Sequence, residues 1–367
     1  MVNYPKLKLS CIAIAIMTSV YSQVSFATLV NNDQEWIIDT PVTDSGTTTI
    51  GSTTNGTLRV VSGGELITRT FRVGINGASG VVYVTNSGTI TVDATGAVPA
   101  NPFDIGDSGG TGEINISGTG SQVTLTSVMR SLRIGTGNDS KGYLNILDGG
   151  KLFHNGENAT QSGIRLGTGA TSTSGVSGEI NVIGASSELW SRRSIFSGYQ
   201  NGQGIVNITQ GGTLHSGEDI IVGNDVSTLD YDNLLFVSGE NSLAKSDFYT
   251  TVGLGGKGTI VISDDATISA LEIRIAGNIG SVGELAVGAR AGETANVAGI
   301  IDTPKIIFGA GDGVLTLNHS GSDFSLAANI SGNGTVNALS GVSTLSGDNS
   351  AYQGNFNIDA QATLIIS

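Results

Sequence analysis

Two pairs of adjacent acids have the clearest potential for chemistry in this sequence, Glu218-Asp219 and Asp264-Asp265. Closely spaced carboxylates carry out the proton transfers of glycoside hydrolysis and also bind calcium. Either role requires the acids to cluster on adjacent turns of the fold. Both pairs fall where turns are expected, and a groove shared by the two pairs is one open prediction. The default prediction is that they are solvated turn acids.

A second chemical motif surrounds Ser108. Residues 106–110 read Gly-Asp-Ser-Gly-Gly, the sequence around the nucleophile of chymotrypsin-like proteases. In those enzymes a histidine that precedes the serine along the chain accepts its proton. His154, His215 and His319 all follow Ser108. We therefore expect a chance match in a chain rich in glycine, serine and aspartate.

Metal and redox chemistry have little support. The three histidines are scattered, and the one cysteine, Cys11, lies close to the first residue. Residues 309–317 resemble the calcium-binding nonapeptide only faintly, because they lack its Gly-Gly-x-Gly-x-Asp order and stand alone. We assign no catalytic, cofactor-binding or metal-binding residue, and we expect no cofactor and no enzymatic activity.

The elements that would position these side chains are written as a repeat. Each copy has a glycine, a short alternating strand, a turn with glycine, and a second strand that ends in glycine. Strands this short bury their apolar faces only by stacking on one another. We predict an all-β fold, a right-handed parallel β-helix (β-solenoid) of about ten coils. Its copies start at Gly56, Gly80, Gly112, Gly142, Gly178, Gly204, Asn233, Gly258, Gly283 and Gly313.

Alternation along the strands predicts which side chains point inward. The inward column of the first strand is Leu58, Val82, Ile114, Leu144, Ile180 and Val206. Its outward column is Arg59, Tyr83, Asn115, Asn145, Asn181, Asn207, Phe236, Val261 and Ala286. We expect the four asparagines to form a ladder of amide hydrogen bonds along the stack.

The outward column of the second strand is rich in arginine. It runs Arg72, Asp104, Arg133, Arg165, Phe196, Ile221, Thr251 and Arg274. We expect a solvated face, since exposed charges mostly serve solubility. The alternative is contact with acidic glycans or with a neighbouring rod.

The first residues indicate export. Lys6 and Lys8 precede an apolar run over residues 9–20, and Ser25-Phe26-Ala27 supplies the small residues of a cleavage site. This order predicts a Sec-type signal peptide. The run is too short to span a membrane as a helix. With 17 basic and 31 acidic residues the chain carries a net charge of −14, which argues against nucleic acid or anionic lipid as partners.

The last residues differ from the repeat. Residues 343–358 read Ser-Thr-Leu-Ser-Gly-Asp-Asn-Ser-Ala-Tyr-Gln-Gly-Asn-Phe-Asn-Ile, and residues 362–366 read Ala-Thr-Leu-Ile-Ile. This stretch resembles the autotransporter-associated β-strand repeat, with one extra residue, Ala351. The earlier coils are similar to autotransporter passengers of the AIDA-like adhesin group. The resemblance covers nearly all of the exported chain.

The resemblance implies a passenger displayed on, or released from, the outer membrane that acts in adhesion, aggregation or biofilm formation. Autotransporters also carry a C-terminal translocator barrel, whereas this sequence stops at Ser367. We therefore expect a truncated passenger, which would end in the periplasm.

These observations give four predicted segments. They are a signal peptide over residues 1–27, an N-terminal cap over 28–55 that uses Trp36, Ile37 and Ile38, β-helix repeats over 56–335, and the terminal repeat over 336–367. The predicted function is an adhesin-like or self-associating scaffold, with surface glycans, surface proteins or a second copy as partner. The alternative is a carbohydrate-active enzyme, either a polysaccharide lyase or a glycosidase.

Overall fold

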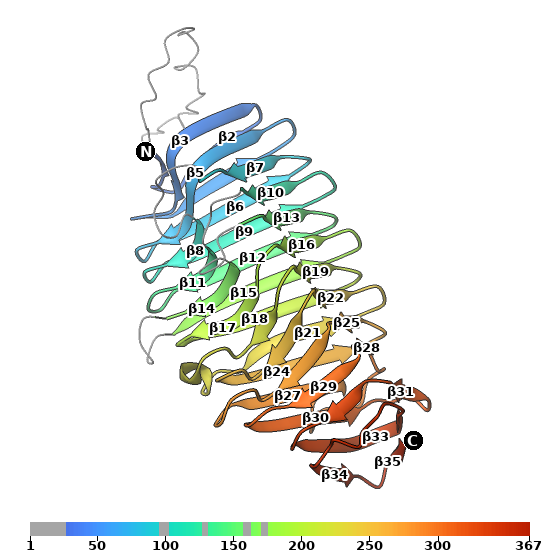
Figure 1. Cartoon of the computed structure of the whole chain (residues 1–367). Coiled ribbons are helices and arrows are strands. Elements are labelled where there is room, and N and C mark those ends of the chain that lie inside the picture. The colour runs from blue at the N-terminus through green and yellow to red at the C-terminus, as the bar shows by residue number, and fades with distance from the viewer. Residues whose placement is uncertain (1–26, 95–102, 127–130, 157–162, 170–174) are drawn as a thin grey trace, which may run out of the picture.

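The chain winds into an elongated stack of parallel strands (Figure 1). The computed structural model describes residues 27–94, 103–126, 131–156, 163–169 and 175–367, so residues 1–26 of the predicted signal peptide lie outside the described part. Within these ranges the only helix is the 3-10 turn η1 (Val226–Thr228). All pairings between named strands are parallel, as in the pairing that places Ile114 beside Leu144. The predicted all-β solenoid is confirmed.

One face of the stack is a sheet of 15 strands in the described ranges. Its strands are β2 (Gln34–Ile38), β4 (Gly56–Val60), β6 (Ser79–Thr85), β9 (Thr111–Ser117), β12 (Lys141–Leu147), β15 (Val176–Ile183), β18 (Gly202–Thr209), β21 (Asn233–Ser238), β24 (Lys257–Ser263), β27 (Val282–Gly288), β30 (Asp312–Asn318), β31 (Phe324–Leu326), β33 (Thr335–Leu345), β34 (Asn355–Ile358) and β35 (Ala362–Ile366). We call this the first sheet.

The remaining 20 strands of the described chain form the second sheet. They are β1 (Thr28–Val30), β3 (Pro41–Ile50), β5 (Glu65–Ile75), β7 (Thr89–Val92), β8 (Phe103–Asp107), β10 (Gln122–Leu125), β11 (Ser131–Thr136), β13 (Lys151–His154), β14 (Gly163–Thr168), β16 (Glu188–Ser191), β17 (Ile195–Gln200), β19 (Thr213–Ser216), β20 (Ile220–Val222), β22 (Leu243–Ser246), β23 (Tyr249–Val252), β25 (Thr267–Ser269), β26 (Glu272–Ile275), β28 (Ile300–Asp302), β29 (Lys305–Phe308) and β32 (Asn329–Ser331).

Most coils contain three strands, not the two predicted. In the coil that begins at β12, the chain passes from the first sheet into β13 and then β14, and β13 and β14 stack on separate columns of the second sheet. We call these the middle and the last column. The sequence analysis identified the last strand by its terminal glycine. It overlooked the middle strand, which has only four residues in most coils.

The predicted register of the first sheet is confirmed. Gly112 pairs with Gly142, and Gly142 with Gly178, without an offset. β2 adds a rung before the first predicted start, and β33 adds one after the last. The segment predicted as a cap thus holds strands of the same stack, with Trp36 paired to Leu58.

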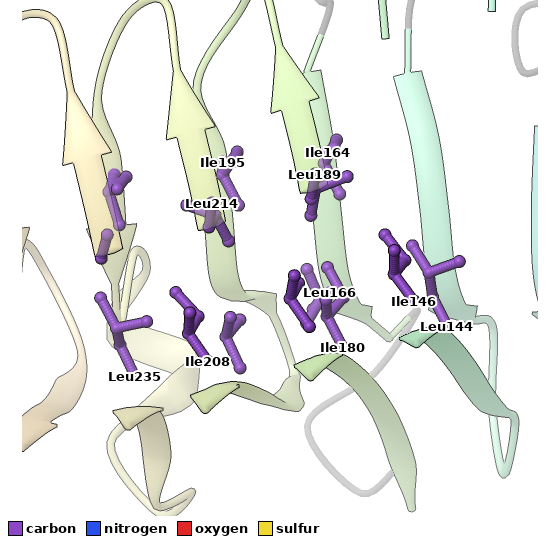
Figure 2. Close-up of a cluster of buried hydrophobic side chains, with 14 of the residues drawn as sticks. Leu144, Ile146, Ile164, Leu166, Ile180, Leu189, Ile195, Ile208, Leu214 and Leu235 are labelled. Atoms are coloured by element: carbon purple, nitrogen blue, oxygen red, sulfur yellow. The ribbon is translucent and has the colours of Figure 1, made fainter. Parts of the chain in front are cut away.

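The core lies between the two sheets. Figure 2 shows side chains of the first sheet, such as Leu144 and Ile180, facing Ile164 and Leu189 of the second. The predicted inward column is buried throughout, with at most 2% exposure at Val206. A side chain of this size contributes about 1.5–3 kcal/mol when it is buried, so the continuous column stabilises every rung through its neighbours.

Glycine is required where the chain turns from one coil to the next. Gly106 has a φ of 72°, and an added Cβ would lie 2.0 Å from the Lys141 carbonyl oxygen. At Gly112 an added Cβ would lie 2.2 Å from the Val73 oxygen. At these two positions a larger residue would force neighbouring rungs apart, which explains why most copies of the repeat are marked by glycine.

The terminal repeat continues the stack. β34 pairs with the first part of β33, and β35 pairs with its last part. The two strands thus follow each other as the first and middle strands of a coil do. Tyr352, the aromatic residue of the motif, donates its hydroxyl proton to carbonyl oxygens of Gly334 at 3.1 Å and Asn355 at 2.8 Å. Its ring lies 5.7 Å from that of Phe308. The motif therefore fixes the path of the last rungs.

The buried polar residues include a histidine in the middle column. His154 has no exposed surface, and its Nδ1 lies 3.2 Å from Ser191 Oγ. The same inward column holds Leu125 on the preceding coil. Burial, together with the charge of Arg193, lowers the pKa of His154 to about 4. The ring is therefore neutral in the folded protein at physiological pH.

We predict that stability falls as the pH drops below 6.5. The folded pKa lies below the unfolded value of 6.5, so unfolding takes up a proton between pH 6.5 and 4, and the stability contributed by neutral His154 is lost over that window. The loss is roughly 3 kcal/mol for a shift of this size. Urea midpoints measured at pH 7 and pH 4.5 should show a smaller difference for His154→Leu than for the unaltered chain.

Ser191→Ala is the matched control. It removes the hydrogen-bond partner but keeps the buried imidazole, so it should lower the urea midpoint at both pH values and preserve the difference between them. An equal pH effect in His154→Leu and in the unaltered chain would show that His154 is not the group responsible.

Candidate functional site

The two acid pairs lie at different corners of the coil. Glu218 and Asp219 occupy the turn between β19 and β20, which joins the middle and last columns. Asp264 and Asp265 occupy the turn between β24 and β25, where the chain leaves the first sheet. The alternative of a groove shared by the two pairs is therefore wrong. The sequence left this shared groove open because the predicted coil had too few strands.

Each acid pair has local partners. Glu218 accepts hydrogen bonds from Arg193 and from the hydroxyl of Ser194. Asp219 accepts one from the Tyr249 amide at 3.0 Å, and burial raises its pKa. Asp264 accepts hydrogen bonds from Ser238, Ser263 and Asn296 side chains. These carboxylates hold turns of adjacent coils together.

Ser108 and the histidines also have separate partners. Ser108 lies in the turn between β8 and β9 with a φ of 52°, and its hydroxyl donates to Asp107 at 3.2 Å. His215 Nε2 lies 2.9 Å from Asp247, and His319 Nε2 lies 2.8 Å from Ser343. Burial lowers the pKa of His319. The structure places none of these histidines in a hydrogen bond with Ser108.

The arginine column has the predicted register but is not a simple solvated face. Arg133 donates to Asp104 at 2.7 Å, and Arg72 lies 3.8 Å from the same fully buried carboxyl. Burial raises the pKa of Asp104, although both arginines act in the opposite direction. Further along, the Arg165 guanidinium lies over the Tyr199 ring at 4.2 Å, and Arg274 lies over Tyr249 at 3.8 Å. The arginines thus bind partners within the chain.

The predicted asparagine ladder is confirmed. Asn145 donates to Asn115 at 2.9 Å, Asn181 to Asn145 at 2.9 Å, and Asn207 to Asn181 at 2.8 Å. A second ladder of the same kind joins Asn357 to Asn337 further along the first sheet. Each amide serves as donor and acceptor along the rod axis, so the ladder reinforces the stacking of rungs.

Residues 289–299 fold over the outer face of the first sheet. Arg290 donates two hydrogen bonds to Asp232, at 2.9 and 3.0 Å, and so reaches back across two coils. Val261 and Ala286, which were predicted to face outward, are buried at 4% and 0% exposure. They do point to the outer face, but this segment covers the sheet there. The sequence gives no periodic signal for such a covering segment.

An open cleft of about 700 Å³ lies beside this segment. Its lining includes Glu293, Asn318 and Asp359.

In the described ranges, no three residues of the histidine, cysteine, aspartate and glutamate types gather as a metal site. Those ranges also contain no helix with the length and hydropathy needed to cross a membrane.

The chain matches no protein-family model. It is 26% identical over 242 residues to the uncharacterized protein YuaQ of Escherichia coli K12, a match that spans 65% of this chain and 16% of YuaQ. The uncharacterized lipoprotein YdeK of the same organism is 36% identical over 122 residues, which is 32% of this chain and 9% of YdeK. The matches thus span less than a fifth of these curated relatives.

A solved structure, that of a TibA fragment hyper-glycosylated by TibC, aligns with 93% of this chain and 95% of the fragment. The sequence identity is 13% and the TM-score is 0.32. A score this low adds no support for a common fold.

We predict that Asn145→Ala lowers stability by about 1–2 kcal/mol, because it breaks two amide hydrogen bonds worth about 1 kcal/mol each. Asn207→Ala, at the end of the ladder, breaks only one of these bonds and should cost about half as much. Urea midpoints of the two variants provide the comparison. Equal costs would show that the ladder does not act as a chain of bonds.

We predict that Arg290→Ala releases the segment over residues 289–299. Two amides of the underlying turn, those of Asp264 and Asp265, donate to Val297 and Ala298 and should exchange with deuterium faster in this variant. Lys257→Ala is the control, because Lys257 contacts Asp232 only at 3.6 Å. Unchanged exchange in Arg290→Ala would mean that the segment is held without this ion pair.

Proposed function

We propose that this chain is the passenger region of an autotransporter-like surface protein and acts as an adhesin-like or self-associating scaffold. The observation that carries the proposal is the continuous stack of parallel rungs, which extends from β2 into the terminal repeat at β33 to β35. Such a rod presents long columns of identical spacing rather than one enclosed site, and extended binding surfaces are the usual product of solenoid folds.

The outer surface of the rod supports the same proposal. Several of its charged side chains are paired with neighbours on adjacent coils, as in Lys151 with Glu188 at 2.9 Å. Its acids hold turns rather than converge on a groove. The terminal motif, which resembles the autotransporter-associated repeat, forms rungs of the same stack.

The proposal includes export. The signal-like first residues support it, and one relative carries the name lipoprotein, which denotes an exported class. A role in biofilm formation and a location at the outer membrane belong to this proposal. We also propose that the chain acts by binding and is not an enzyme.

Adhesion is tested with beads coated with the chain from Thr28 to Ser367. We expect saturable attachment to bacterial or host cells, or clumping of the beads, above the level of albumin-coated beads. Glu218→Gln and Asp264→Asn should leave attachment unchanged, because both acids hold turns away from a common groove. The outcome that sinks the proposal is absence of attachment together with polysaccharide cleavage that either substitution abolishes.

A further inference from the structure

Three aromatic side chains lie one above another on the outer face of the middle strands. Phe153 of β13 pairs with Trp190 of β16, and Trp190 pairs with His215 of β19. All three are partly exposed, while the residues on either side of each are buried. Parallel rungs repeat at about 4.8 Å, so the column is roughly 10 Å long. We call it the aromatic column.

The aromatic column is confined to three rungs. Thr124 precedes it on β10 and Lys245 follows it on β22. The chain has two tryptophans, and they differ in surroundings. Trp36 packs against the core, whereas Trp190 lies outside the core. Within the described part of the chain, no other ring, ion or hydrogen-bond partner contacts the Trp190 indole. The indole is partly exposed, and its N–H has no described hydrogen-bond partner.

Polar groups flank the rings on both sides. Lys151 and Glu188 stand two residues before Phe153 and Trp190, and they pair at 2.9 Å. On the other side, Asp247 accepts from His215 at 2.9 Å and from Lys245 at 3.1 Å. The surface thus offers carboxylate oxygens and N–H donors beside the rings. Arg192 and Arg193 follow β16 directly, and Arg193 pairs with Glu218.

This combination fits an uncharged sugar chain. A pyranose ring has an apolar face that stacks on an aromatic ring and hydroxyls at its rim that need planar donors and acceptors. The spacing of rungs is close to the length of one sugar unit in an extended chain. A polyanion is disfavoured by the net charge of −14 on the chain. Single-stranded nucleic acid is disfavoured for the same reason.

We propose that the aromatic column binds a neutral linear oligosaccharide that lies along the rod axis. Sugar rings stack on Trp190 and Phe153, and their hydroxyls bond to Glu188 and Asp247. This assignment names the ligand class of the scaffold and so rests on the proposed function.

The test measures binding of neutral cello-, malto-, manno- and chito-oligosaccharides to the chain from Thr28 to Ser367 by calorimetry and tryptophan fluorescence. We expect saturable binding of at least one of them, a loss of at least tenfold in affinity in Trp190→Ala, and partial recovery in Trp190→Phe. Phe236→Ala is the matched control, because Phe236 is a partly exposed aromatic residue on the outer face of the first sheet. It should change the affinity less than twofold.

Several results would overturn the assignment. They are no binding of any neutral oligosaccharide at millimolar concentration, equal affinity in Trp190→Ala, and preference for heparin or polygalacturonate. Circular dichroism of each variant establishes that the fold is retained. If coated beads attach to cells but neutral oligosaccharides neither bind nor compete, this inference fails while the proposed function stands. If the beads do not attach, the proposed function itself fails.

Discussion

The backbone hydrogen bonds between consecutive rungs are the interaction on which the rest of this structure depends. They form in register from β2 to β30 along the first sheet, and they continue with one shift into β33. In such a stack every side chain lies directly above its equivalent, so each position of the coil becomes a column. Like residues in one column pack and bond to one another, as in the isoleucine and leucine core, the asparagine ladder and the glycines at the corners.

The same constraint explains how much could be predicted from the sequence. The ten strand starts, the inward column and the asparagine ladder follow from a repeat that is visible at single-residue spacing. The middle strand was overlooked because its period-2 signal is only four residues long, as in Lys151–His154. The middle strand separates the turn of Glu218 from the turn of Asp264. A coil predicted without this strand therefore left open a groove shared by the two acid pairs.

Other features have no repeating signal at all. Residues 289–299 cover Val261 and Ala286 and are held in part by an ion pair between Arg290 and Asp232, residues of different coils. Asn233 stands where the other coils start with glycine, and its amide accepts from Gly204 and donates to Lys257. Both sets of contacts depend on local packing. A periodic pattern cannot specify a contact that occurs only once. The position of Asn233 follows from the repeat, but its hydrogen-bond partners and those of Arg290 do not.

The aromatic column illustrates how a repetitive scaffold acquires a local surface. The core needs only the inward positions of β13, β16 and β19, namely Leu152, Leu189 and Leu214, so the outward positions are free to vary without loss of the fold. Three partly exposed rings offer a ligand few contacts, so a single site of this kind binds weakly. Many copies on one surface raise the effective concentration of sites for a polymer with repeating units. A rod with weak, regularly spaced contacts is therefore better suited to adhesion than to the tight capture of one molecule.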